Sequence, residues 1–207
     1  MKLFLASSLD KTLHRLKEVA PDVGKKVLFV ANAADPYVAT MDLFWIRLDR
    51  EVFQKEGYQL EEIDLRTSTP EEFDTKIKES DILHIAGGGV YYLIELLKSG
   101  GFDKIIIERV KDGSVVYTAT SAGSIIASET LATFAPDKEE TVMMRDSLNK
   151  VGLGLINFVI VPHNDNPVWG SNEAMVTAMQ NNPEALFFLR DNQAVWVDDG
   201  GARLVSA

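Results

Sequence analysis

Residues 115–129, VVYTATSAGSIIASE, pass from an apolar stretch through a cluster of small residues into sequence that favours a helix. The first part is β-branched and apolar, as in a strand that is buried on both faces of a parallel sheet. A strand that turns sharply into a helix is the repeating unit of α/β proteins. This stretch therefore predicts an α/β fold, provided that the rest of the chain repeats the unit.

The same alternation of strands and helices runs along all 207 residues. Apolar or alternating patterns predict strands at 2–7, 25–33, 58–65, 81–89, 114–120, 158–166, 184–189, 194–199 and 202–207. Helical patterns fall at 7–20, 34–57, 69–80, 90–101, 102–113 and 172–182, with an irregular connection at 130–155. We expect one domain over residues 1–207, with three layers and a mostly parallel, doubly wound sheet.

Two of these helices carry recognisable start signals. In the helix predicted at 34–57, Asp35 is expected as the cap, Pro36 in the first turn and Gly57 at the end. In the helix predicted at 69–80, Thr69 is expected as the cap, with a proline directly after it.

Composition restricts the partners. The formal charge of −10 argues against nucleic acid or an anionic membrane, because both attract positive surfaces. No cysteine is present, which excludes disulfides, thiolate metal sites and a cysteine nucleophile. The apolar run near the N-terminus is shorter than the roughly seven residues of a signal peptide, so a first core strand is the better interpretation. We expect a cytoplasmic protein that needs no cofactor.

Three polar or glycine-rich stretches follow predicted strands: residues 87–89, 119–124 and 163–166. In open parallel sheets, ligands bind beyond the carboxyl ends of the strands. We therefore expect these three stretches to form one site.

Ser121 lies in a small-x-Ser-x-Gly pattern that runs from Ala119 to Gly123. A nucleophile elbow needs small residues at these positions, because the chain reverses so sharply that larger side chains would clash. The N–H of Ala122, at the start of a helix, could then donate to an oxyanion. Alternatively, Ser121 is only the cap of that helix.

The glycines at 87–89 allow the backbone to approach a ligand closely. The spacings of a dinucleotide-binding loop and of a P-loop are both absent. We expect Gly88 to contact the substrate and the N–H of Gly89 to be a second oxyanion donor. A tight turn without chemistry is the alternative.

Of the three histidines, only His163 follows a strand in a polar loop, where it could accept the proton of Ser121. An acid that orients this base could be Asp137, Asp165 or Asp191. Asp191 lies in a polar turn between two predicted strands, and Asp137 is the reserve choice. A metal site at the same loop is not expected, because no second histidine has a suitable spacing.

Four blocks, in this order, resemble the serine peptidases that include α-aspartyl dipeptidase (peptidase E) and cyanophycinase: AGGGVYYLIELLKSGG, GSVVYTATSAGSIIA, FVIVPHNDN and LFFLRDNQAVWV. The resemblance implies a fold like that of class I glutamine amidotransferases. It implies Ser121 as nucleophile, His163 as general base, and Gly89 with Ala122 as oxyanion donors. The third member in this family is often glutamate, and Asp191 stands at the matching position.

The sequence also departs from this family. Val90 and Tyr91 stand where asparagine and threonine are common. Aspartyl-specific members are expected to have a basic residue after the histidine, yet no lysine or arginine occurs from Asn164 to Leu189. A preference for aspartate is therefore not supported, although Arg145 or Arg190 could bind a carboxylate.

The favoured hypothesis is a serine-type peptidase that cleaves dipeptides or a related small peptide or amide. A non-catalytic binding or regulatory protein on the same scaffold is one alternative, and an esterase or amidase for other acyl compounds is another. The apolar residues in 41–53 would be buried within the monomer in the simplest account, but they also allow a homodimer.

Overall fold

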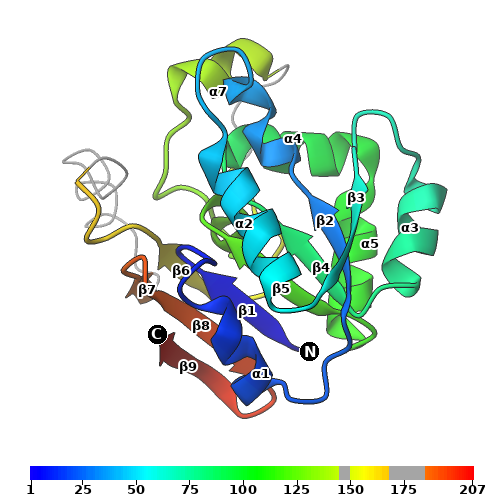
Figure 1. Cartoon of the computed structure of the whole chain (residues 1–207). Helices are drawn as coiled ribbons and strands as arrows, with labels where there is room; N and C mark the ends of the chain where they lie inside the picture. Colours follow the sequence, from blue (N-terminus) through cyan, green and yellow to red (C-terminus); the bar gives the residue numbers. More distant parts are fainter. Residues whose placement is uncertain (145–149, 168–184) are drawn as a thin grey trace.

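The computed structural model describes residues 1–144, 150–167 and 185–207. A seven-stranded sheet with the order β3-β2-β4-β5-β1-β8-β9 forms its centre (Figure 1). Its strands are β1 (Leu3–Ala6), β2 (Lys26–Val30), β3 (Gln59–Ile63), β4 (Ile82–Ile85), β5 (Val116–Thr120), β8 (Gln193–Asp198) and β9 (Gly201–Ser206).

The sheet is mostly parallel, as predicted. Strands β3, β2, β4, β5 and β1 pair in parallel, whereas β8 runs antiparallel to β1 and β9 runs antiparallel to β8. Strand β5 lies between β4 and β1, with Ile85 opposite Ala119 and Ala6 opposite Thr120. The loops that follow β4, β5 and β1 therefore leave the same edge of the sheet side by side.

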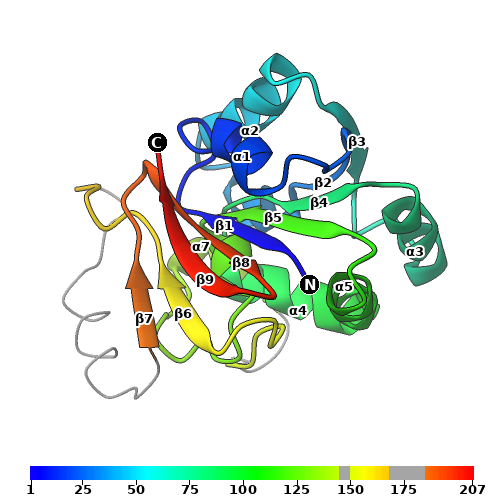
Figure 2. The same cartoon turned by 90° about the horizontal axis from the view of Figure 1, so that it is seen from below.

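Helices cover both faces of this sheet, which makes three layers (Figure 2). Helices α1 and α2 lie on one face, and α4 and α5 lie on the other. The helical segments are η1 (Leu13–Arg15), α1 (Leu16–Val19), η2 (Asn32–Tyr37), α2 (Phe44–Lys55), α3 (Pro70–Lys78), α4 (Val90–Gly100), α5 (Phe102–Lys111), α6 (Ala122–Ile125) and α7 (Lys138–Met143). Thr69 caps α3 by accepting a hydrogen bond from the Glu72 N–H, as predicted.

Each face of the sheet has its own core. Leu5, Leu28 and Leu83 face the side of α3, α4 and α5, whereas Phe4 and Phe29 face the side of α1 and α2. This alternation follows from the strand period of two. Both faces are buried, which explains why these strands are apolar along their whole length.

The α-helix predicted at 34–57 is wrong for residues 34–43. Its N-terminal part is the 3-10 segment η2, and α2 begins only at Phe44. The expected cap, Asp35, instead accepts hydrogen bonds from the side chains of Asn32 and Tyr92, each at 2.9 Å. A local contact with Asn32 and a long-range contact with Tyr92 therefore replace the helix capping that the sequence suggests.

Two strands lie outside the main sheet. Strands β6 (Phe158–Val161) and β7 (Ala185–Phe188) pair in parallel as a separate two-stranded sheet. The connection at 130–155, predicted as irregular, contains the short helix α7. The helix predicted at 172–182 lies outside the described residues. Among the described helices, none has the length and apolar character that crossing a membrane requires.

Candidate active site

Ser121 occupies a strained turn directly after β5. Its backbone has φ 46° and ψ −112°, an unusual conformation for a residue with a side chain. The turn leaves no room around it: a Cβ atom on Gly123 would lie 2.2 Å from the carbonyl oxygen of Ile85. Gly123 of the predicted pattern is therefore required by close backbone packing, and Ser121 directly follows the end of β5.

His163 faces Ser121 from the end of the smaller sheet. It follows β6, has φ 60°, and its Nε2 atom lies 2.9 Å from Ser121 Oγ. Its Nδ1 atom lies 2.6 Å from Asp191 Oδ1. Since a carboxylate can only accept a hydrogen bond, Nδ1 carries the proton and donates a hydrogen bond to Asp191. Nε2 is then free to accept a hydrogen bond from the Ser121 hydroxyl.

Asp191 lies in the turn between β7 and β8, where the Gln193 N–H donates to the Arg190 carbonyl at 2.9 Å. The Asn166 amide donates to Asp191 Oδ2 at 3.1 Å. Burial acts to raise the pKa of Asp191, but hydrogen bonds from Asn166, His163 and Ser7, with the charge of His163, outweigh it. The net effect lowers this pKa, so the carboxylate stays charged beside the imidazole.

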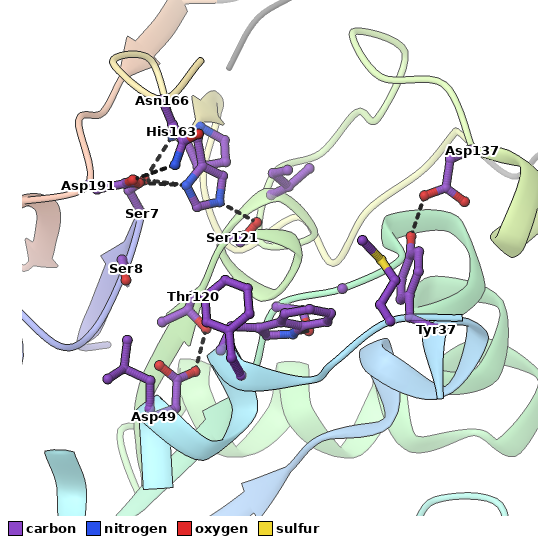
Figure 3. Close-up of a pocket in the computed structure, with 18 of the residues that line it drawn as sticks. Ser7, Ser8, Tyr37, Asp49, Thr120, Ser121, Asp137, His163, Asn166 and Asp191 are labelled. Carbon is purple, nitrogen blue, oxygen red and sulfur yellow. Dashed lines mark hydrogen bonds and ion pairs between the residues drawn. The ribbon is translucent and has the colours of Figure 1, made fainter. Parts of the chain in front are cut away.

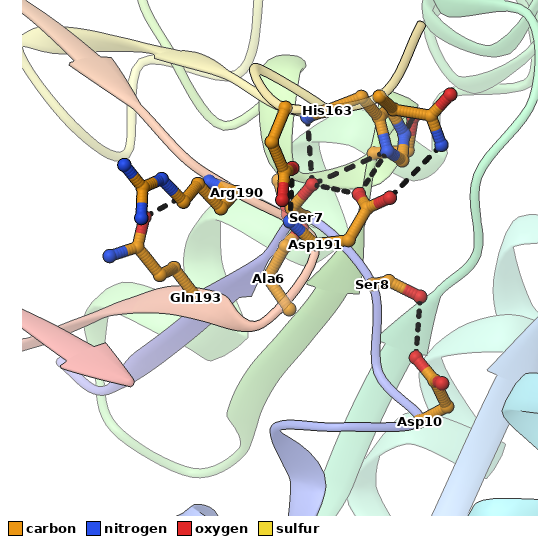
Figure 4. Close-up of polar contacts among 12 residues, drawn as sticks. Ala6, Ser7, Ser8, Asp10, His163, Arg190, Asp191 and Gln193 are labelled. Atoms are coloured by element: carbon orange, nitrogen blue, oxygen red, sulfur yellow. Dashed lines mark hydrogen bonds and ion pairs between the residues drawn. The ribbon is translucent and has the colours of Figure 1, made fainter. Parts of the chain in front are cut away.

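Ser7 completes this group, and the sequence analysis did not identify it. Its hydroxyl donates to Asp191 Oδ1 at 2.9 Å and accepts the backbone N–H of His163 at 2.8 Å (Figure 4). Ser7 directly follows β1, which is a parallel neighbour of β5. Its position at the end of the strand predicted at 2–7 was the available signal, but serine is too common at strand ends and in loops for that signal to stand out.

These side chains border a cavity of about 300 Å³. Ser121, His163 and Asp191 lie on one side of it, and Tyr37 with Asp137 lies on the opposite side (Figure 3). Much of the remaining wall is aromatic or aliphatic, from Met41, Phe44, Trp45, Leu48, Ile125 and Phe134. Within the described part of the chain, no lysine or arginine lines the cavity.

The model of peptidase family S51 matches residues 3–205. The chain belongs to this family. An uncharacterized peptidase of Listeria monocytogenes is 26% identical over 197 residues, which cover 94% of this chain and 93% of that protein. An uncharacterized peptidase of Pasteurella multocida is 26% identical over 168 residues, covering 80% and 78%. Membership of family S51 makes the chain a relative of serine peptidases.

Two crystal structures share the fold. A protein of Listeria monocytogenes EGD-e, provisionally assigned as peptidase E, superposes with a TM-score of 0.85 at 24% identity, covering 100% of this chain and 98% of that one. A peptidase from an acI-B1 Actinobacterium gives a TM-score of 0.71 at 18% identity, covering 100% and 87%. At these identities the likeness supports the three-layer α/β fold and nothing finer.

In this S51 family member, two of the three candidate acids do not contact the imidazole. Asp137 caps α7, where Oδ1 accepts from the Glu140 N–H at 2.8 Å, and Oδ2 accepts from the Tyr37 hydroxyl at 2.5 Å. Asp165 Oδ1 accepts from the Asp191 N–H at 3.0 Å. Asp191 is thus the candidate that is hydrogen-bonded to His163, and the reserve choice of Asp137 does not fit.

The glycine loop corrects one predicted role. The N–H of Gly89 donates to the carbonyl oxygen of Ala33 at 2.7 Å, so it is not available to an oxyanion. Within the described ranges, the N–H groups of Gly88 and Ala122 have no hydrogen-bond partner. Gly88 has φ 149°, and a Cβ atom there would lie 2.1 Å from the Ala33 oxygen. Only glycine fits this position, which borders the cavity. Contact of Gly88 with a substrate stays a prediction.

Arg190, expected to contact the substrate, lies outside the cavity. Its side chain is exposed and points away from Asp191 and His163 (Figure 4). Arg145, the other candidate for binding a carboxylate, falls outside the described residues. Among those residues, no group of three histidine, aspartate or glutamate side chains is arranged to hold a metal ion.

Glu140 was also not identified from the sequence. This buried side chain, 4% exposed, accepts the N–H groups of Tyr91 at 2.7 Å and Tyr92 at 3.2 Å. These N–H groups belong to the first turn of α4, directly after Gly89. Burial raises the pKa of Glu140 to about 7, against the opposing effect of the backbone donors. Glu140 therefore fixes the glycine loop beside the cavity.

Proposed function

We propose that this S51 family member is a serine hydrolase that cleaves dipeptides or similarly small peptides through an acyl-enzyme. The observation that carries the proposal is the continuous series of hydrogen bonds from Ser121 through His163 to Asp191, at 2.9 and 2.6 Å, beside a cavity. Such a series needs no metal and is the arrangement that activates a serine hydroxyl. A cavity near 300 Å³ is at the small end for ligand pockets, which favours short substrates.

In the first half of the proposed reaction, Ser121 Oγ attacks the scissile carbonyl carbon while His163 Nε2 takes the hydroxyl proton. The carbonyl oxygen becomes an oxyanion, and the N–H groups of Gly88 and Ala122 are the candidates to stabilise it. Asp191 stabilises the imidazolium and holds the ring in place. Collapse of the tetrahedral intermediate breaks the C–N bond, and the amine leaves with the proton from His163.

In the second half, water attacks the ester carbonyl and gives a proton to His163. The second tetrahedral intermediate collapses, Ser121 regains its proton, and the carboxylic acid leaves. The strained backbone of Ser121 supports this role, since such strain persists where the surrounding structure holds it and often occurs at functional sites. The sharp turn at Ser121, directly between β5 and α6, supports the proposal that it is a nucleophile elbow.

The Ser121→Ala variant tests this proposal. We expect it to lose at least about 10³-fold in kcat against any dipeptide that the parent protein cleaves. The parent, but not the variant, is expected to react with a fluorophosphonate probe, with the adduct located on Ser121 by mass spectrometry. Ser99→Ala is a matched control, because Ser99 is exposed on α4 and donates only to the Leu96 carbonyl at 3.3 Å.

Two results would contradict the proposal in different ways. If Ser121→Ala hydrolyses peptides as fast as the parent, the mechanism is wrong. If the parent neither reacts with the probe nor hydrolyses peptides or esters, a non-catalytic binding protein is the better description. If the protein hydrolyses esters but no peptide, the proposed role of Ser121 as nucleophile stands and the proposed substrate class is wrong.

A further inference from the structure

The cavity has a continuous apolar wall that the proposed chemistry does not use. Phe44, Trp45 and Leu48 are contributed by α2, and Met41 lies in the segment before it. Met41 is 40% exposed and Phe44 is 48% exposed, which is a large exposure for side chains of this size. Apolar side chains that gather at the mouth of a cavity are typical of a binding surface.

Two hydrogen bonds fix this wall relative to Ser121. The indole N–H of Trp45 donates to the Gly87 carbonyl at 3.0 Å, and Asp49, one turn further along α2, accepts from the Thr120 hydroxyl at 2.8 Å. Gly87 lies in the loop after β4, and Thr120 is the last residue of β5, directly before Ser121. A Cβ atom on Gly87 would lie 3.0 Å from Ser121 Cβ. The wall therefore lies next to the position of the reacting carbonyl carbon.

The charges in the cavity disfavour an acidic ligand. Asp49, Asp137 and Glu140 all border it, and the described lining contains no lysine or arginine. A carboxylate side chain would lose its hydration there without gaining a cationic partner. A cationic side chain would find the acids already engaged: Asp137 accepts from Tyr37, Asp49 accepts from Thr120, and Glu140 accepts from α4.

From this wall, its anchoring and its charge, we infer that the cavity binds an aromatic or branched aliphatic side chain on the acyl side of the scissile bond. The inference rests on the proposed function, because the side chain is carried by the residue whose carbonyl reacts with Ser121. Phe44 and Met41 are then specificity-determining residues. The substrate class becomes small peptides that begin with a large apolar residue.

A set of diphenyl α-aminoalkylphosphonates that differ only in the side chain tests this inference. These probes phosphonylate a reactive serine, so the rate of adduct formation on Ser121, measured by intact mass, reports side-chain preference without a known substrate. We expect the benzyl and isobutyl probes to react at least about tenfold faster than the carboxymethyl probe. A faster reaction of the carboxymethyl probe, or of an aminobutyl probe, would overturn the apolar assignment.

Variants of the wall give a second readout. Phe44→Ala is expected to slow the benzyl probe about five- to tenfold more than it slows a methyl probe. Phe44→Arg is expected to shift the ratio of rates toward the carboxymethyl probe. Leu204→Ala, which removes another exposed apolar side chain far along the chain on β9, is the matched control. Unchanged preferences in both Phe44 variants would also overturn the inference.

These outcomes separate the inference from the proposed function. If a small fluorophosphonate labels Ser121 but the side-chain probes show no apolar preference, the proposed chemistry stands and the specificity is wrong. If no probe labels Ser121, the proposed function itself fails, and the specificity inference fails with it.

Discussion

Asp191 is held by three side chains, two from the loop after β6 and one from the end of β1. His163, Ser7 and Asn166 all donate to its carboxylate, at 2.6, 2.9 and 3.1 Å. Ser7 also accepts the backbone N–H of His163, so one hydroxyl positions both the acid and the base. A carboxylate held in this way keeps the imidazole in one tautomer, and its lowered pKa keeps it ionised.

Replacing Asp191 by asparagine should therefore disturb the base more than the fold. We expect Asp191→Asn to lower kcat/KM by about 10²- to 10⁴-fold, because an amide N–H that faces Nδ1 favours the tautomer with the proton on Nε2. Steady-state kinetics on one dipeptide, together with circular dichroism, checks this. Asp137→Asn is the comparison, and its loss should be far smaller. Equal losses in the two variants would contradict the assignment of Asp191.

The sequence could indicate a candidate site residue where a short stretch around that residue carries the pattern. Ser121 lies within five residues that reveal its turn, and His163 stands out because only three histidines exist and only one follows a strand. The glycine whose N–H group faces the cavity without a partner among the described residues could not be predicted. Whether Gly88 or Gly89 has a free N–H depends on the carbonyl of Ala33, which follows a different strand, β2.

At the scale of elements, α7 and the start of α4 act as one unit. Glu140 of α7 accepts two N–H groups of the first turn of α4, and its other oxygen accepts the Asp137 N–H at 3.3 Å. The first N–H groups of a helix have no partners within the helix, so a side chain must supply them. A Cβ atom on Gly89 would lie 2.6 Å from Glu140 Cγ, so the contact also limits the loop sterically.

This buried carboxyl predicts a pH-dependent stability. The pKa of Glu140 is raised to about 7, above its ordinary value of 4.5, so the folded state binds the proton more tightly than the unfolded chain does. Protonated Glu140 therefore contributes fully to the free energy of unfolding below about pH 4.5. This contribution is lost as the pH rises through 7, which changes the free energy of unfolding by about 3 kcal/mol. We expect Glu140→Gln to lack this loss.

Urea unfolding of the parent and Glu140→Gln between pH 5 and pH 8 measures the effect. The difference between their free energies of unfolding should shift in favour of the variant as the pH rises. Glu139→Gln, which removes the neighbouring carboxylate of the same helix, is the matched control and should track the parent. Parallel curves for the parent and Glu140→Gln would contradict the raised pKa.

The helix predicted at 7–20 also begins later than expected, at Leu13. Two other elements that the sequence misjudged fail for different reasons. The start of α2 was placed too early because Asp35 has the local features of a cap but contacts Asn32 and Tyr92 instead. Helix α7 was missed although Asp137 and Glu140 form a capping box, because its six residues are too few to give a clear helical period. Other contacts of Asp35 in the first case and short length in the second limit what a local pattern can predict.

At the scale of the whole molecule, the candidate site joins two sheets. Ser7 and Ser121 follow strands of the main sheet, whereas His163 follows β6 of the smaller one. The alternation of strands and helices predicted the main sheet and its parallel order. It could not predict that β6 and β7 separate from it, because both strands have the same apolar pattern as those of the main sheet.

The position of His163 therefore depends on how β6 packs against the main core. Phe158 and Ile160 belong to the core that includes Ile125 of α6, whereas Val159 and Val161 form a separate small cluster with Phe134 and Leu186. Ile160 is fully buried in that core, so its packing helps to hold β6 in place next to α6. Stability and activity should be linked at this residue.

We expect Ile160→Ala to lower the free energy of unfolding by about 2–4 kcal/mol, because it leaves a cavity in the core. It should also slow fluorophosphonate labelling of Ser121 several-fold under conditions in which the variant remains folded, since a looser β6 holds His163 less firmly against the serine. Leu204→Ala, 51% exposed on β9, is the control and should change neither quantity. Suppose that Ile160→Ala is destabilised to the expected extent but that its Ser121 is labelled at the same rate as in the parent. The packing of β6 then does not determine the geometry of His163. The alignment of the base would then depend on the hydrogen bonds from Ser7 and Asp191 alone.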